Sequence, residues 1–76
     1  MKDFKFRILR QYGVLSKWKS GWQKEVNLVS WNGQAPKIDI REWSPDHETM
    51  GSGITLSKQE QKKLSVILQY ILLNAE

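Results

Sequence analysis

The chain has no cysteine, two prolines and one histidine among its 76 residues. The missing cysteines exclude disulfides and thiolate metal sites, and they fit a protein of the reducing cytoplasm. A metal site would need more nitrogen or sulfur ligands than His47 alone offers, so we expect no metal and no cofactor. The longest apolar cluster, residues 66–73, is too short and too interrupted to span a bilayer, and the charged residues 1–6 do not form a signal peptide. We therefore expect a cytoplasmic protein with no membrane partner.

The chain is also short, and it lacks catalytic motifs. We assign residues 1–76 to one domain, near the lower size limit for burying an adequate core alone. Ser44, Ser52 and Thr55 have no base beside them in the sequence, and no loop has the Gly-x-x-x-x-Gly-Lys form that cradles phosphates. We predict that the protein is not an enzyme and has no small-molecule substrate.

Tryptophan and positive charge are what the sequence has in abundance. Residues 1–41 hold nine Lys or Arg against three acidic residues, and all four tryptophans lie in the first three-fifths of the chain. A base can stack on a flat ring while a neighbouring cation neutralises its phosphate, so this pattern favours single-stranded nucleic acid as the partner. The tryptophans are Trp18, Trp22, Trp31 and Trp43, and the cations between or beside them are Lys17, Lys19, Lys24, Lys37 and Arg41.

Alternating apolar residues predict four β-strands joined by short loops, which favours an antiparallel meander. A bulge or bend is expected at Gly13, and Asn32-Gly33 signals a turn. In the second strand Leu28 and Val29 are adjacent, so the sequence leaves open which face points inward. The strands are expected over residues 4–15, 22–31, 37–43 and 53–56.

The third strand has the clearest division between its faces. Ile38 and Ile40 take one face, and Lys37, Asp39, Arg41 and Trp43 take the other. We expect the isoleucines to lie buried behind the sheet and the guanidinium and indole to point onto an open binding surface.

A C-terminal helix is expected from a capping box, Ser57-Lys-Gln-Glu60, to about Asn74. Its apolar residues fall in two stripes at helical spacing. The first should cover the isoleucine side of the sheet, and the second predicts a homodimer through the helices of two copies. The first stripe is Leu64, Ile67, Leu68, Ile71 and Leu72, and the second is Val66, Tyr70 and Leu73.

Four short sequence motifs follow one another over about residues 22–57. They are Val29-Ser30-Trp31-Asn32, Lys37-Ile-Asp-Ile-Arg-Glu-Trp43, the Trp-Ser-Pro-Asp-His-Glu stretch at 43–48, and Gly53-Ile-Thr-Leu56 before a helix. In this the chain resembles the positive cofactor 4 family of transcriptional coactivators, and most closely its bacterial YdbC-like members. Relatives tend to carry a lysine where this chain has Ser52, so the basic contribution of that loop is missing here.

The resemblance implies a curved four-stranded antiparallel sheet followed by one helix, an α+β fold that dimerises through its helices. It also implies single-stranded DNA bound across the sheets with little sequence preference, in transcription regulation, replication or repair, by a nucleoid-associated protein. It places Lys24, Trp31, Lys37, Arg41 and Trp43 at the DNA. The residue pattern alone adds Trp18, Lys19 and Trp22 to this set.

These side chains also have structural interpretations. Arg41 could pair with Asp39, Trp43 could cap the end of the core, and Trp31 could cover a hairpin. The remaining indoles, Trp18 and Trp22, could pack on Tyr12. Two other functions fit the same residues: a protein–protein adaptor that uses the Trp and Arg face as its interface, and a binder of single-stranded RNA.

Overall fold

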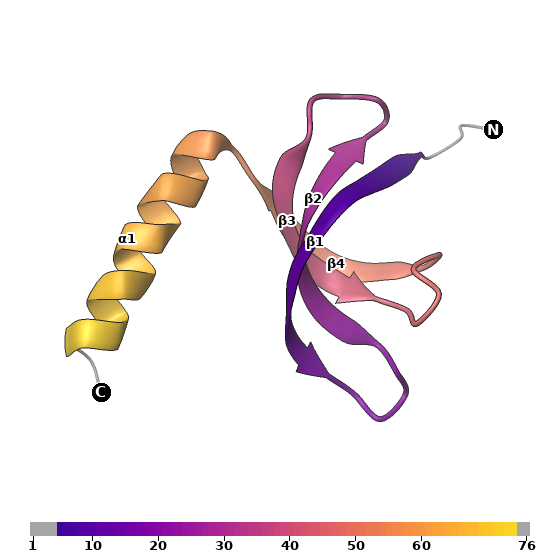
Figure 1. The fold of residues 1–76 in the computed structure, drawn as a ribbon, viewed down its shortest axis with the longest axis horizontal. Coiled ribbons are helices and arrows are strands. Elements are labelled where there is room, and N and C mark those ends of the chain that lie inside the picture. The colour runs from indigo at the N-terminus through magenta and orange to yellow at the C-terminus, as the bar shows by residue number, and fades with distance from the viewer. Residues whose placement is uncertain (1–4, 75–76) are drawn as a thin grey trace.

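The computed structural model describes residues 5–74 and has the predicted order of four strands and one helix (Figure 1). The four strands form one sheet in the order β1-β2-β3-β4, and each neighbouring pair is antiparallel. This confirms the α+β fold, although Phe4 of the predicted first strand lies outside the described residues. The elements are β1 (Phe6–Lys17), β2 (Gln23–Trp31), β3 (Lys37–Trp43), β4 (Met50–Leu56) and α1 (Lys58–Asn74).

Local sequence signals account for the connections between these elements. Asn32 and Gly33 both have positive φ, 51° and 78°, and the Gln34 N–H donates to the Trp31 carbonyl at 2.9 Å, which confirms the predicted turn. Strand β1 carries three register shifts against β2, one of them between Gln11 and Gly13. Bulges increase the local twist of a strand, so β1 coils around the sheet instead of lying flat.

The sheet is strongly curved. Phe6 pairs with Trp31 at one end of β2, and Trp43 pairs with Gln23 at the other end. In a straight strand these ends would lie roughly 26 Å apart at about 3.3 Å per residue. The rings of Phe6 and Trp43 nevertheless lie 5.1 Å apart between centroids. The side chains at the two ends of β2 therefore meet across one face, which we call the inner face.

The inner face holds the buried residues, and the other face is apolar but incompletely covered. Val29 and Trp43 are the fully buried hydrophobic residues among those described. They share the inner face with buried polar residues, of which Asn27 and Asp39 are neighbours in the β2–β3 register. Leu28 lies on the opposite face, so the open question for β2 is settled with Val29 inward. We call that opposite surface the apolar face, and it carries Val26, Leu28, Ile38, Ile40 and Leu56.

Helix α1 begins as predicted. The Ser57 N–H donates to Glu60 Oε1 at 2.9 Å, and the Glu60 N–H donates to Ser57 Oγ at 3.1 Å, which is the reciprocal pattern of a capping box. No helix in the described part of the chain is long and apolar enough to cross a membrane.

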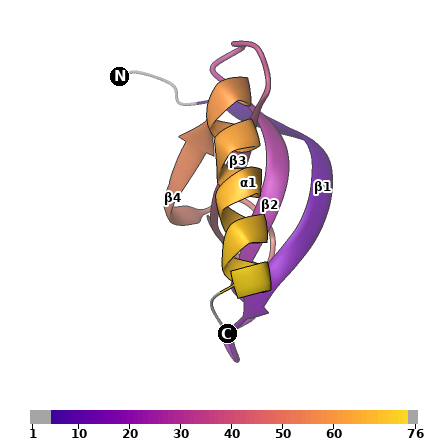
Figure 2. The same cartoon turned by 90° about the vertical axis from the view of Figure 1, so that its left-hand side faces the viewer.

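The expectation that the helix seals the isoleucine side is wrong for a single chain. Figures 1 and 2 show α1 running in front of the sheet but standing apart from it along most of its length. A cleft of about 460 Å³ separates Leu64 and Leu68 from Ile38 and Ile40, and α1 has no buried residue. Leu72 of the predicted stripe is 80% exposed. The physical reason is that the short link at Ser57 leads the helix away from the sheet, so only its first turns lie over the strands.

Candidate nucleic-acid interface

Trp43 is a core residue, which corrects the prediction that it lies on an open surface. Its side chain is 0% exposed. The Phe6 ring lies 5.1 Å from its indole, and the His47 imidazole stacks on it at 5.7 Å with an interplanar angle of 26°. Trp43 does share a face with Arg41 and Asp39, as the alternation of side chains along β3 predicts. The curvature of the sheet closes this face, so a base cannot reach the Trp43 ring.

Arg41 is largely occupied by contacts within the fold. Its Nε donates to Asp39 Oδ1 at 2.7 Å, and its Nη2 donates to Asp39 Oδ2 at 2.9 Å. Nη1 donates to the Gly51 carbonyl at 3.2 Å, and the guanidinium stacks over the Trp31 ring at 4.9 Å. Only 16% of the Arg41 side chain is exposed, against 0% for Asp39. The prediction that the Arg41 guanidinium points freely onto an open face is therefore wrong. The hydrogen bonds above use three of the five N–H groups of the guanidinium, and its edge still reaches solvent.

A second polar cluster on the inner face joins β2 to the loop between β3 and β4. The Glu25 carboxylate accepts from Gln23 Nε2 at 2.7 Å and from Asn27 Nδ2 at 3.0 Å. His47 Nε2 lies 2.9 Å from Glu25 Oε2, and it must be the donor because an ionised carboxylate only accepts. Burial would raise the pKa of Glu25, but the hydrogen bonds from Asn27, Gln23 and His47 outweigh it and hold that pKa below its usual value.

We expect this cluster to make the fold sensitive to acid. A carboxylate with a lowered pKa in the folded state stabilises the protein above its unfolded pKa of about 4.3, and the contribution is lost as the pH falls through the folded value. Melting temperatures measured from pH 7 to pH 3 should therefore fall more steeply for the wild type than for Glu25→Gln, whose amide does not titrate. The same slope in both proteins would show that Glu25 does not contribute to the acid transition.

The hairpin between β1 and β2 carries the most exposed tryptophan. Trp18 is 42% exposed and lies between two exposed lysines, Lys17 and Lys19. The turn is closed by the Trp18 N–H, which donates to the Trp22 carbonyl at 2.9 Å. Gly21 has a φ of 96°, and a Cβ at this position would lie 2.8 Å from Pro45 Cγ. The close approach of Pro45 fixes the base of the hairpin, so its tip presents an indole and two cations to solvent.

The remaining predicted residues do not form one surface. Trp22, just before β2, and Trp31, at the end of β2, are both half-buried, and the Trp31 ring also lies 5.9 Å from the Phe6 ring. Lys24 is opposite Glu42 in the register and lies on the apolar face, whereas Lys37 is exposed at the start of β3. The structure therefore brings Trp31, Arg41 and Trp43 together through Phe6. It leaves the hairpin and the two lysines as separate features.

Two residues of the inner face were not found from the sequence. Phe6 could have been found, because its alternation with Ile8 on β1 already placed an aromatic on one face. His47 could not, because its partner Glu25 is 22 positions away and no local pattern links them. Within the described residues no group of three or more His, Cys, Asp or Glu side chains could hold a metal ion.

The geometry defines a class of protein: a small, highly curved four-stranded sheet with a C-terminal helix and solvent-exposed tryptophan and lysine. Comparison with known proteins gives the family. The sequence model of the transcriptional coactivator p15 (PC4) family matches residues 18–67, and the chain belongs to that family. The domain of this family is a nucleic-acid-binding fold. The chain is also 47% identical over 58 residues to an uncharacterized protein of Treponema pallidum (strain Nichols), covering 76% of this chain and 68% of that protein. The similarity to YdbC-like members remains a prediction.

Proposed function

We propose that this protein is a non-catalytic single-stranded DNA-binding protein with little sequence preference, acting in transcription regulation, replication or repair. Its family supports DNA as the partner. The observation that carries the proposal is the exposed Trp18 ring between Lys17 and Lys19. An indole offers a stacking surface to any base, and the flanking ammonium groups suit the phosphates on either side. In this proposal the protein acts in the cytoplasm, in association with the nucleoid.

Selectivity for single strands follows from what such a surface can reach. The faces of bases are available in a single strand, whereas a duplex stacks them against one another. Trp22 directly precedes β2 at the base of the hairpin, and the exposed edge of the Trp31–Arg41 stack offers a second place for a base and a phosphate. Lys19, Lys24 and Lys37 would add contacts to the backbone. Trp43 has no direct role, because its ring is buried.

Trp18→Ala is expected to weaken binding of poly-dT by about 1–3 kcal/mol, the usual loss for one base–aromatic stack. The matched variant Trp18→Phe keeps a ring at the tip of the hairpin and should retain most of the affinity. Both variants lack the Trp18 fluorophore, so the comparison is made by fluorescence anisotropy of a dye-labelled oligo-dT with the wild type and both variants at fixed low salt. Wild-type protein that shows no quenching by poly-dT would refute the proposed function.

The salt dependence of binding separates this function from the two alternatives. Contacts to phosphates release counterions, so the logarithm of the binding constant should fall linearly with the logarithm of salt concentration. An aromatic interface with another protein should change little over the same range. Parallel titrations with poly-U and duplex DNA test the RNA alternative and the preference for single strands.

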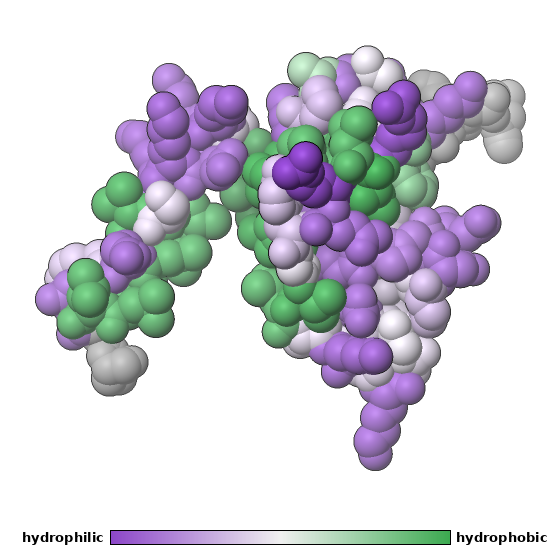
Figure 3. All heavy atoms as spheres, in the orientation of Figure 1, coloured by the Kyte–Doolittle hydropathy of each residue, from purple (hydrophilic) through white to green (hydrophobic). Residues whose placement is uncertain are grey.

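We also propose that two copies pair through α1. Val66, Tyr70 and Leu73 are 65–77% exposed, and the apolar face is open beneath the helix. In Figure 3 the start of α1 is hydrophilic and its later turns are hydrophobic, so the pairing surface lies toward the C-terminal end. A monomer would leave this area in water, and a second copy related by a two-fold axis would cover it. Light scattering should give twice the mass of one chain, and a monomer would refute the pairing.

A further inference from the structure

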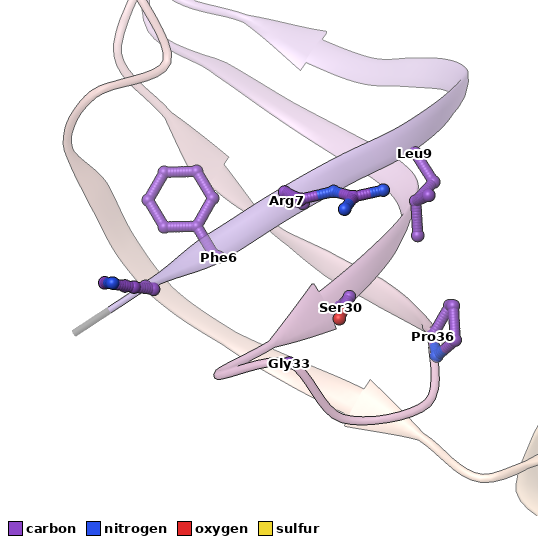
Figure 4. A pocket seen from close by; sticks show the side chains of 7 residues that line it. Phe6, Arg7, Leu9, Ser30, Gly33 and Pro36 are labelled. Carbon is purple, nitrogen blue, oxygen red and sulfur yellow. The ribbon is translucent and has the colours of Figure 1, made fainter.

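A basic groove runs along the edge of the apolar face, away from the Trp18 hairpin. It consists of two clefts, of about 580 and 430 Å³, which share Pro36 as a lining residue. Figure 4 shows the first cleft, with Arg7 and Leu9 of β1 on one side and Pro36 on the other. The second cleft continues from Pro36 to the start of α1. The cations that line the basic groove are Lys5, Arg7, Lys37 and Lys58.

The charge of the basic groove has one sign. Lys5 and Arg7 line the first cleft, Lys37 and Lys58 line the second, and none of the lining residues is acidic. All four cations are exposed. In this they differ from Arg41, whose charge is matched by the buried Asp39 carboxylate. Four exposed cations that line two clefts meeting at Pro36 attract a ligand with several negative charges, not a single anion.

The walls between these cations are apolar or aromatic. Leu9 and Leu28 line the two clefts, and Tyr12, 54% exposed, lines the second. The Arg10 guanidinium lies over the Tyr12 ring at 6.0 Å, which adds a fifth cation at this point. The presence of both positive and apolar side chains suits a chain of phosphates joined by sugars, because the phosphates can meet the cations while the sugars lie on the apolar walls.

We propose that the basic groove binds the sugar–phosphate backbone of a nucleic-acid strand and is a second contact surface, separate from the Trp18 hairpin. The choice of nucleic acid as the ligand rests on the proposed function. The second cleft shares Tyr12, Ile38, Leu56 and Gln61 with the cleft beneath α1, but none of the four cations lines the cleft beneath α1. A second copy that fills the cleft beneath α1 therefore does not occupy the positions of the cations. Each chain then has two sites for one strand, one that stacks bases and one that holds phosphates.

The test compares two double variants that remove the same charge. Arg7→Gln with Lys58→Gln removes one cation from each cleft of the basic groove, and Lys62→Gln with Lys63→Gln removes two exposed lysines of α1 that do not line it. Each phosphate contact to a single strand contributes about 0.7 to the slope of log binding constant against log salt. The groove variant should therefore lose about 1.4 from the slope measured with oligo-dT, and the helix variant should keep the wild-type slope.

Each outcome decides one statement. If the wild type binds oligo-dT and both variants show the same slope, the basic groove does not hold the strand, and the proposed function stands without it. If the wild type does not bind oligo-dT, the proposed function itself fails. Poly-glutamate serves as the acidic-protein probe. If the groove variant loses binding to poly-glutamate but keeps the wild-type slope with oligo-dT, the groove takes an acidic protein, and the inference is overturned.

Discussion

Trp43→Ala is expected to lower the free energy of unfolding by about 3–5 kcal/mol, the range for truncating a large buried aromatic side chain. The indole is 0% exposed and packs against Phe6 and His47, so its removal leaves a cavity where the two ends of the curved sheet meet. Chemical denaturation followed by circular dichroism measures the loss. A loss of this size is a large fraction of the stability of a small domain, so part of the variant population should be unfolded at 37 °C.

Trp43→Phe is the matched control for this prediction. The Trp43 Nε1 atom is buried and finds no acceptor among the described residues, so a phenyl ring retains much of the packing and removes an unsatisfied donor. We expect it to be markedly more stable than Trp43→Ala. If Trp43→Ala instead unfolds like the wild type and only loses affinity for DNA, Trp43 is a binding residue and its burial has been misinterpreted.

The secondary structure was accessible from the sequence because each element is encoded locally. The alternation of Ile38 and Ile40 predicts β3, and the Asn32-Gly33 pair predicts the turn before it. Ser57 and Glu60 predict the start of α1. Each of these signals involves residues at most three positions apart. The fourth strand is longer than predicted, because it begins at Met50, which pairs with Trp43, and residues 50–52 have no apolar alternation to signal a strand.

The candidate site was less accessible, because it depends on curvature. Strand parity placed Arg41 and Trp43 on one face, but it could not show that Phe6 of β1 folds over that face. The alternation of side chains along β3 also predicts that the isoleucine face forms the core. The structure instead places Asn27 and Asp39 in the interior and leaves Ile40 beside an open cleft. Long-range pairs such as Glu25 with His47 and Asp39 with Thr55 decide this arrangement, and no local pattern encodes them.

Asp39→Ala is expected to be the other strongly destabilising substitution. The Asp39 carboxylate accepts two hydrogen bonds from Arg41 and one from Thr55 Oγ1 at 2.8 Å, and it has no exposure to solvent. Removing one partner of a buried ion pair costs about 3–5 kcal/mol, since the other charge is left unmatched. We expect the lower end of that range, because Arg41 is 16% exposed and water can reach its guanidinium.

A double variant separates the structural role of this pair from a role in binding. Asp39→Ala with Arg41→Leu removes both charges and fills part of the space with an apolar side chain, which should restore much of the lost stability. If Arg41 serves mainly to neutralise Asp39, the double variant binds poly-dT nearly as well as the wild type. If stability recovers but affinity falls tenfold or more, the exposed edge of Arg41 contacts the strand beside Trp31. An Asp39→Ala loss below about 1 kcal/mol, the scale of an exposed ion pair, would contradict the structural role itself.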